Sequence, residues 1–205
     1  MASGPDGRTA RHMTVAGFLS LAWQTLVAPR EVARMLLGLQ LSREALLTGF
    51  GLVVVLNALI VGLMQMGGEL AAMGGLMPVS MGLLLAVMLA GTIGALTWAG
   101  RSFGGRARLE DVAVLLIWLQ GLRAVAQVGV ALVGAVSGGL AVLLVLAALL
   151  VGLWILVCFV DEAHGFGSPL KALLVLILAT AVLVAALMMI VSLMGVGPNG
   201  MASYV

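Results

Sequence analysis

Charged residues are scarce in this sequence. Of its 205 residues, only 9% are Asp, Glu, Lys or Arg, whereas 63% are hydrophobic. An ordinary soluble domain carries about a quarter charged residues and about half apolar ones. A chain of this length cannot bury so much apolar side chain within itself, so lipid must be part of its solvent. The composition therefore predicts a membrane protein and excludes an ordinary soluble domain.

Cysteine and lysine each occur once, and the short motifs of catalysis are absent. Cys158 has no second cysteine to pair with, which excludes an intramolecular disulfide and a cysteine-based metal cluster. There is no His-Glu-x-x-His, no Gly-x-Ser-x-Gly and no phosphate-binding loop. Lys171 is the one lysine beside nine arginines, a bias typical of a GC-rich bacterial genome. We therefore predict a non-enzymatic protein with no cofactor, no metal and no nucleic-acid partner.

Five long apolar runs, separated by polar or Gly/Pro-rich breaks, dominate the chain. A run of about 20 apolar residues is long enough to cross a bilayer as an α-helix. The runs predict an all-α fold, namely a polytopic membrane helical bundle of five transmembrane helices within residues 42–195. The break at 137–139 is so short that the helices on either side should form a tight antiparallel hairpin. The predicted spans are residues 46–66, 79–100, 112–136, 140–160 and 170–194.

Short amphipathic helices are predicted at residues 14–41, before the first span. The stretches 14–27 and 29–40 each gather apolar side chains on one helical face. Such helices lie in the plane of the membrane interface, although packing against the ends of the spans is an open alternative. We expect residues 1–13 to be a disordered tail and residues 196–205 an external tail. No cleaved signal peptide is expected, because the first long apolar run lies too deep in the chain.

Nine of the ten cations fall in one set of alternate loops, and the opposite set has none. Loops on the cytoplasmic side are enriched in Lys and Arg. The sequence therefore predicts a multi-pass protein of the cell inner membrane with a cytoplasmic N-terminus and a periplasmic C-terminus. Its first partner is the lipid bilayer, and anionic lipids are candidate ligands of the arginines. The candidate contacts for lipid headgroups are Arg30, Arg34, Arg101, Arg106 and Arg108.

Arg123 is the one charge that lies well inside a predicted span. An arginine there costs about 3 kcal/mol on insertion scales and is a candidate functional residue. Gln120 and Gln127 share its helical face, and Asn57 of the first span is a candidate partner. These four residues are a candidate intramembrane polar site that could bind an anionic solute. The favoured interpretation is structural, because a long arginine side chain can reach the headgroup level from about 7–8 Å below it.

Small residues recur every four positions in the second span, at Gly82, Ala86, Ala90 and Gly94. Small residues at this spacing let helix backbones approach closely in lipid. Internal packing is the ordinary role of such a ridge. A seam for self-association, or for another membrane protein, is the alternative.

Asp161, Glu162 and His164 form the densest polar cluster of the sequence. Carboxylates and histidine are metal-ligand types, yet one loop with a single histidine lacks the geometry of a metal site. We therefore interpret the cluster as the cap of the fourth span and the turn that follows it.

Three short motifs outside the spans carry a family resemblance. They are Trp23 with Ala28-Pro29-Arg30-Glu31-Val32, then Phe103-Gly104-Gly105-Arg106-Ala107-Arg108, and Asp161-Glu162-Ala163-His164-Gly165-Phe166-Gly167-Ser168. With five spans and a cytoplasmic N-terminus, the chain resembles the Yip1 family of multi-pass membrane proteins, particularly its bacterial members. The resemblance implies a membrane scaffold or adaptor that acts through helix packing and through contacts with lipid or partner proteins. Two alternatives stay open, a small transporter of an anionic solute and an accessory subunit of a larger membrane complex.

Overall fold

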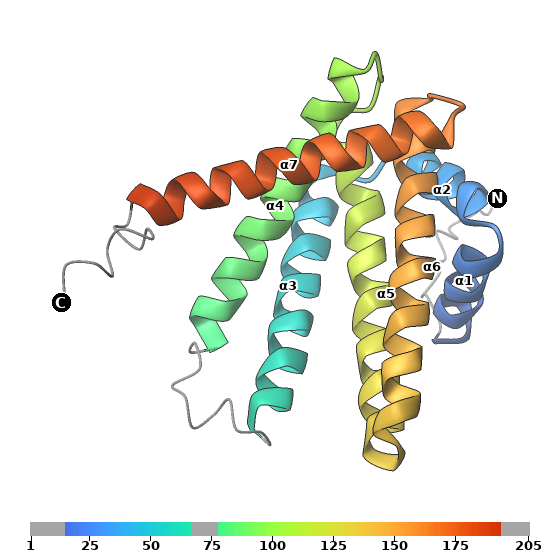
Figure 1. Ribbon diagram of the computed structural model, residues 1–205. Helices are drawn as coiled ribbons and strands as arrows, with labels where there is room; N and C mark the ends of the chain where they lie inside the picture. Colours follow the sequence, from blue (N-terminus) through green and yellow to red (C-terminus); the bar gives the residue numbers. More distant parts are fainter. Residues whose placement is uncertain (1–14, 67–77, 194–205) are drawn as a thin grey trace, which may run out of the picture.

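The computed structural model describes residues 15–66 and 78–193 (Figure 1). The described residues form seven α-helices and no strand. These are α1 (Val15–Val27), α2 (Pro29–Gly38), α3 (Arg43–Met66), α4 (Pro78–Ser102), α5 (Leu109–Val136), α6 (Gly138–His164) and α7 (Pro169–Leu193). Helices α3 to α7 are long and apolar enough to cross a membrane. The predicted all-α fold, with five spans preceded by short helices, is confirmed, while both predicted tails lie outside the described residues.

Helix ends follow local chemistry. The Ser42 hydroxyl oxygen accepts a hydrogen bond from the Ala45 amide at 3.2 Å, at the start of α3. The Asp111 carboxylate accepts one from the Arg108 amide at 2.8 Å and so caps α5. Helix α6 ends at His164, and its C-cap Gly165 has a φ of 67°, a left-handed conformation that favours glycine. Pro169 is the first residue of α7, where a missing amide hydrogen costs nothing.

The hairpin of α5 and α6 is tighter than its sequence predicts. Ser137 alone separates the two helices, because Gly138 and Gly139 already belong to α6. The Ser137 amide donates to the Val133 carbonyl, and its own carbonyl accepts from the Ala141 amide. One residue therefore closes α5 and opens α6, and Figure 1 shows the two helices packed along their length.

Helix α7 is arranged differently from the other spans. Figure 1 shows it crossing α4 at a steep angle, whereas α3, α5 and α6 run roughly alongside one another. Ala172, Val175 and Ala179 in its first half are buried against the bundle. Large apolar side chains in its second half, such as Met188 and Leu193, are exposed. The fifth apolar run is thus a continuous helix that is anchored to the bundle by its first half.

The two short helices contact the spans in different ways. Helix α2 packs against α5 and α6 and buries Val32, Ala33 and Leu36. Helix α1 is held by Trp118 of α5, whose indole N–H donates to the buried Thr25 hydroxyl at 3.1 Å. Packing against the spans, the alternative left open by the sequence, therefore describes α2. Contact of these helices with the membrane interface stays a prediction.

The small-residue ridge of α4 is only partly used inside the molecule. A Cβ on Gly82 would lie 3.7 Å from Ala58 of α3, which is ordinary packing distance. Ala90 is exposed, and a Cβ on Gly94 would meet nothing within 4 Å. The neighbouring Ala99 is fully buried. The ridge therefore packs on α3 near Gly82 and is open further along the helix.

Candidate functional site

Parts of four helices meet at one end of the bundle. The C-terminal ends of α4 and α6, the start of α5 and the whole of α2 meet there, with the loops 103–108 and 165–168 (Figure 1). We call this region the helix-end junction. It consists of Arg30, Arg34, Gly100, Gly105, Asp161, Glu162 and His164.

Asp161 connects two separate parts of the junction. Its side chain is only 4% exposed, and Oδ2 accepts a hydrogen bond from the Arg30 guanidinium at 3.0 Å. Oδ1 accepts from the Ser168 amide at 2.9 Å. Both oxygens of a nearly buried carboxylate are therefore satisfied, as the cost of burying an unpaired charge requires. The result is that α2 and the loop before α7 are both held to the end of α6.

A second ion pair lies beside the first. The Arg34 guanidinium donates to both oxygens of the Glu162 carboxylate, at 2.7 and 3.3 Å. The hydrogen bond and the charge of Glu162 raise the pKa of Arg34 above its ordinary value. Arg30 and Arg34 are one turn apart on α2, and their acidic partners are consecutive residues on α6. Two parallel contacts therefore fix the rotation of α2 as well as its position.

His164 lies under the loop between α4 and α5. Its Nδ1 is 3.0 Å from the Val160 carbonyl oxygen, which can only accept, so Nδ1 carries the proton. Its Nε2 is buried and has no hydrogen-bond partner among the described residues. The ring stacks on Phe166 with centroids 5.2 Å apart. A Cβ on Gly100 or on Gly105 would overlap the ring, so both positions need glycine.

The α4–α5 loop is closed over this histidine by backbone contacts. The Arg106 amide donates to the His164 carbonyl at 3.2 Å, and the Gly105 amide donates to the Gly100 carbonyl at 2.9 Å. Gly104 adopts a φ of 82°, which turns the loop. The close approach of backbone and imidazole depends on the Gly-Gly pair that the sequence shows between its arginines.

Internal contacts involve four of the five arginines that the sequence marks as headgroup contacts. Arg30 and Arg34 pair with α6, the Arg101 Nε donates to the Ala107 carbonyl at 3.3 Å, and Arg108 lies 3.7 Å from Glu110. Arg106 is exposed. Lipid contact of these residues stays a prediction. The two ion pairs were not predicted from the sequence, although the matching pairs of opposite charge on α2 and α6 were a usable signal.

The predicted intramembrane residues lie around one small cavity between α3, α4 and α5. Asn57, Gln120, Arg123 and Gln127 line it, and its volume is about 60 Å³. The Asn57 amide donates to the Val53 carbonyl of its own helix at 2.7 Å. The buried Gln127 Oε1 has no hydrogen-bond partner within the described chain. Arg123 forms no ion pair with any described residue, so the four residues share a cavity without bonding to one another there.

A comparison with models of protein families tests the family resemblance that the three motifs indicate. The Yip1 domain matches residues 23–191, which is most of the chain. The chain belongs to the Yip1 family. Searches of curated proteins and of solved structures each found no match. The matched Yip1 region includes the helix-end junction and the cavity beside Arg123.

The three motifs that carry the Yip1 resemblance are brought together by the fold. Residues 28–32 supply Arg30, residues 103–108 supply the glycine loop, and residues 161–168 supply Asp161 and His164. Segments more than a hundred residues apart in sequence thus form one contact network. Within the described residues there is no group of three or more side chains placed to hold a metal ion.

Proposed function

We propose that this Yip1-family protein is a non-enzymatic membrane scaffold or adaptor, and that the helix-end junction is the rigid surface it offers to partner proteins or lipid. One observation carries the proposal. The carboxylate of Asp161 uses both oxygens within the chain, and Glu162 and Arg34 use each other. Groups engaged in this way hold segments in place and are poorly suited to attack or protonate a substrate.

The size of the cavity at Arg123 argues against the transporter alternative. Small-molecule sites occupy about 300–1,000 Å³, whereas this cavity has about 60 Å³. That volume has room for water but not for an organic anion. Arg123 is itself exposed, so no enclosed site for a solute surrounds its side chain.

We also propose that the protein lies in the cell inner membrane with its N-terminus in the cytoplasm. Helix α2 and the loops that contain Arg106 and Gly165 lie at the same end of the bundle (Figure 1). This end carries Arg30, Arg34, Arg101, Arg106 and Arg108. A phosphatase fused after Val205 should be active in the periplasm. An inactive fusion that is present at full length would overturn this orientation.

The open part of the α4 ridge is a second surface for a partner. Ala90 is exposed, and a Cβ on Gly94 would meet no atom of the described residues within 4 Å. Small residues on a lipid-facing helix allow a second helix to approach closely. This observation favours self-association or an accessory role in a larger membrane complex.

A ligand screen separates the scaffold from the transporter. The full-length protein and the Arg123→Leu variant are heated with a panel of common anions, and the unfolding temperature of each is recorded. We expect no anion whose stabilising effect depends on Arg123, because a ligand stabilises only a state that binds it. Arg106→Gln is the control, since it removes an exposed charge far from the cavity. A reproducible stabilisation that disappears in Arg123→Leu and persists in the control would favour the transporter.

The adaptor role has its own test. The protein is purified in native lipid particles, and co-purifying proteins are quantified by mass spectrometry. We expect a stoichiometric partner that Asp161→Asn loses and that Glu31→Gln, a charge change at an exposed position of α2, retains. Absence of any such partner from both the wild type and the Glu31→Gln control would contradict the adaptor.

A further inference from the structure

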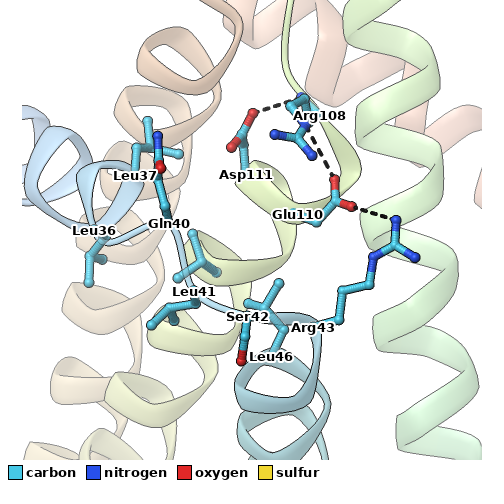
Figure 2. A pocket seen from close by; sticks show the side chains of 11 residues that line it. Leu36, Leu37, Gln40, Leu41, Ser42, Arg43, Leu46, Arg108, Glu110 and Asp111 are labelled. Carbon is cyan, nitrogen blue, oxygen red and sulfur yellow. Dashed lines mark hydrogen bonds and ion pairs between the residues drawn. The ribbon is translucent and has the colours of Figure 1, made fainter.

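A larger cavity lies beside the junction, where α3 and α5 begin. Its volume is about 550 Å³, within the range of pockets that bind small molecules. Figure 2 shows the side chains that surround it, which come from the end of α2, the linker into α3, the first turn of α3 and the start of α5. They are Leu36, Leu37, Gln40, Leu41, Ser42, Arg43, Leu46, Arg108, Glu110, Asp111 and Val114.

The cavity has an apolar side and a charged side. Leucines of α2, the linker and α3 form the apolar side, and Leu41 is 42% exposed at its edge. The charged side holds Arg43 and Arg108, with Glu110 between them (Figure 2). A cavity with one apolar side and one charged side fits a ligand that is charged at one end and apolar at the other.

The ion pairs in this cavity are loose. Arg43 and Arg108 each lie 3.7 Å from a Glu110 oxygen, whereas a well-formed hydrogen bond between guanidinium and carboxylate is about 2.7–2.9 Å. Asp111, by contrast, is engaged as the cap of α5. Glu110 and the two arginines can therefore exchange their mutual contacts for contacts with a ligand at small cost.

The position of the cavity indicates where such a ligand would come from. Arg43 is the first residue of α3 and Leu109 the first of α5, and both helices continue as apolar spans. The start of a span lies at the level of the lipid headgroups. Leu47, one turn into α3, is 70% exposed and continues the apolar surface towards the hydrocarbon. A lipid molecule can therefore reach the cavity from the bilayer.

We propose that this cavity binds a phospholipid with a primary ammonium headgroup, of the phosphatidylethanolamine class. The phosphate lies between Arg43 and Arg108, the ammonium donates to Glu110, and the apolar wall covers the start of an acyl chain. The proposal deepens the scaffold function, on which it rests in part, by naming the lipid that the protein contacts.

Two features of the lining select this class. The cavity has two cationic and two acidic side chains, so a zwitterion matches it better than an anionic lipid does. Quaternary ammonium groups are bound by aromatic cages, and no aromatic residue is among the described residues that line the cavity. A primary ammonium, which can donate hydrogen bonds to a carboxylate, fits the site.

The test uses the full-length protein in detergent and measures binding by native mass spectrometry and by thermal stabilisation. The probes are phosphatidylethanolamine, phosphatidylcholine and phosphatidylglycerol with identical acyl chains, and soluble glycerophosphoethanolamine. We expect phosphatidylethanolamine to bind about tenfold more tightly than the other two lipids. The soluble headgroup should bind weakly, because it lacks the chain that covers the leucines.

Matched variants assign the effect to this cavity. Glu110→Gln should remove the preference for the ethanolamine lipid, and Arg43→Gln should weaken all three lipids. Glu44→Gln and Lys171→Gln remove one acidic and one cationic charge at exposed positions outside the cavity lining and should leave the preference intact. Because the Arg43 side chain is 87% exposed, its variant should fold even if Glu110→Gln does not.

Each contrary result has a clear meaning. Equal binding of the three lipids, or an unchanged preference in Glu110→Gln, overturns the proposal. Tightest binding of phosphatidylglycerol would make the site an anionic one. Binding of the soluble headgroup as tight as that of the lipid would show that a free phosphoester is the ligand. None of these results alters the partner and anion experiments above, so the scaffold function can stand or fail independently.

Discussion

The helix-end junction and the cavity beside Arg123 each contain one buried polar atom without a hydrogen-bond partner among the described residues. In the junction this atom is Nε2 of His164, and at the cavity it is Oε1 of Gln127. Their surroundings differ. Glycine backbone and the Phe166 ring close around the histidine, whereas Gln127 borders about 60 Å³ of free space, which has room for water.

This difference indicates in which region a substitution should affect the stability of the protein more strongly. A close-packed site cannot take an added atom without displacing its neighbours, while a site with space can. The junction also holds two ion pairs, and Arg123 holds none with a described residue. We therefore expect the protein's stability to depend strongly on the junction and weakly on the cavity.

The largest effect is expected from Gly100→Ala. The added Cβ would overlap the His164 ring, and overpacking of this kind costs about 3 kcal/mol. The measurement is the free energy of unfolding, or the unfolding temperature, of the purified protein in detergent. Gly94→Ala on the same helix is the control, because its Cβ would meet nothing within 4 Å. Equal behaviour of the two variants would show that the junction is not close-packed.

A smaller loss is expected from Asp161→Asn. The amide can still accept from the Ser168 amide, but the charge that pairs with Arg30 is gone. Breaking a fully buried pair costs about 3–5 kcal/mol, and since the Arg30 side chain is 44% exposed we expect about 2 kcal/mol. Glu162→Gln is the control, and its more exposed pair should matter much less. A larger loss in the control would reverse the order of the two ion pairs.

The smallest effect is expected from Arg123→Leu. With no ion pair to lose, this variant removes a charge that is costly in a span, so stability should be unchanged or slightly higher. Thermal unfolding in detergent and in lipid nanodiscs measures it. A loss of more than about 1 kcal/mol would show that Arg123 has a partner, and the two regions would then be alike.

The spans could be predicted because their signal is local. Twenty apolar residues in sequence require lipid or a helical neighbour, whatever else the chain does, and α3 to α7 begin or end near the predicted limits. Ser168 and Pro169 likewise mark the start of α7 through local geometry. The steep crossing of α7 over α4 was not predictable, because crossing angles depend on side-chain packing between helices.

The junction could be predicted only in part. The sequence shows that residues 161–164 cap a span, and α6 does end there. It does not show that His164 lies against Gly100, since this contact depends on how α4 and α6 pack. The pairing of Arg30 with Asp161 joins residues 131 positions apart. Periodicity carries no information about contacts at that separation. The complementary charges of the two segments were the one signal that could have indicated this pairing.

The one-residue connection between α5 and α6 has a consequence for how the chain enters the bilayer. Helix α5 carries Arg123 and two glutamines and has the lowest mean hydropathy of the five spans, whereas α6 is among the most apolar. The two are joined through Ser137 alone, so they form one antiparallel unit. The favourable transfer of α6 into lipid offsets the unfavourable transfer of the arginine. We therefore expect the least apolar span to enter the bilayer together with α6 more readily than it would alone.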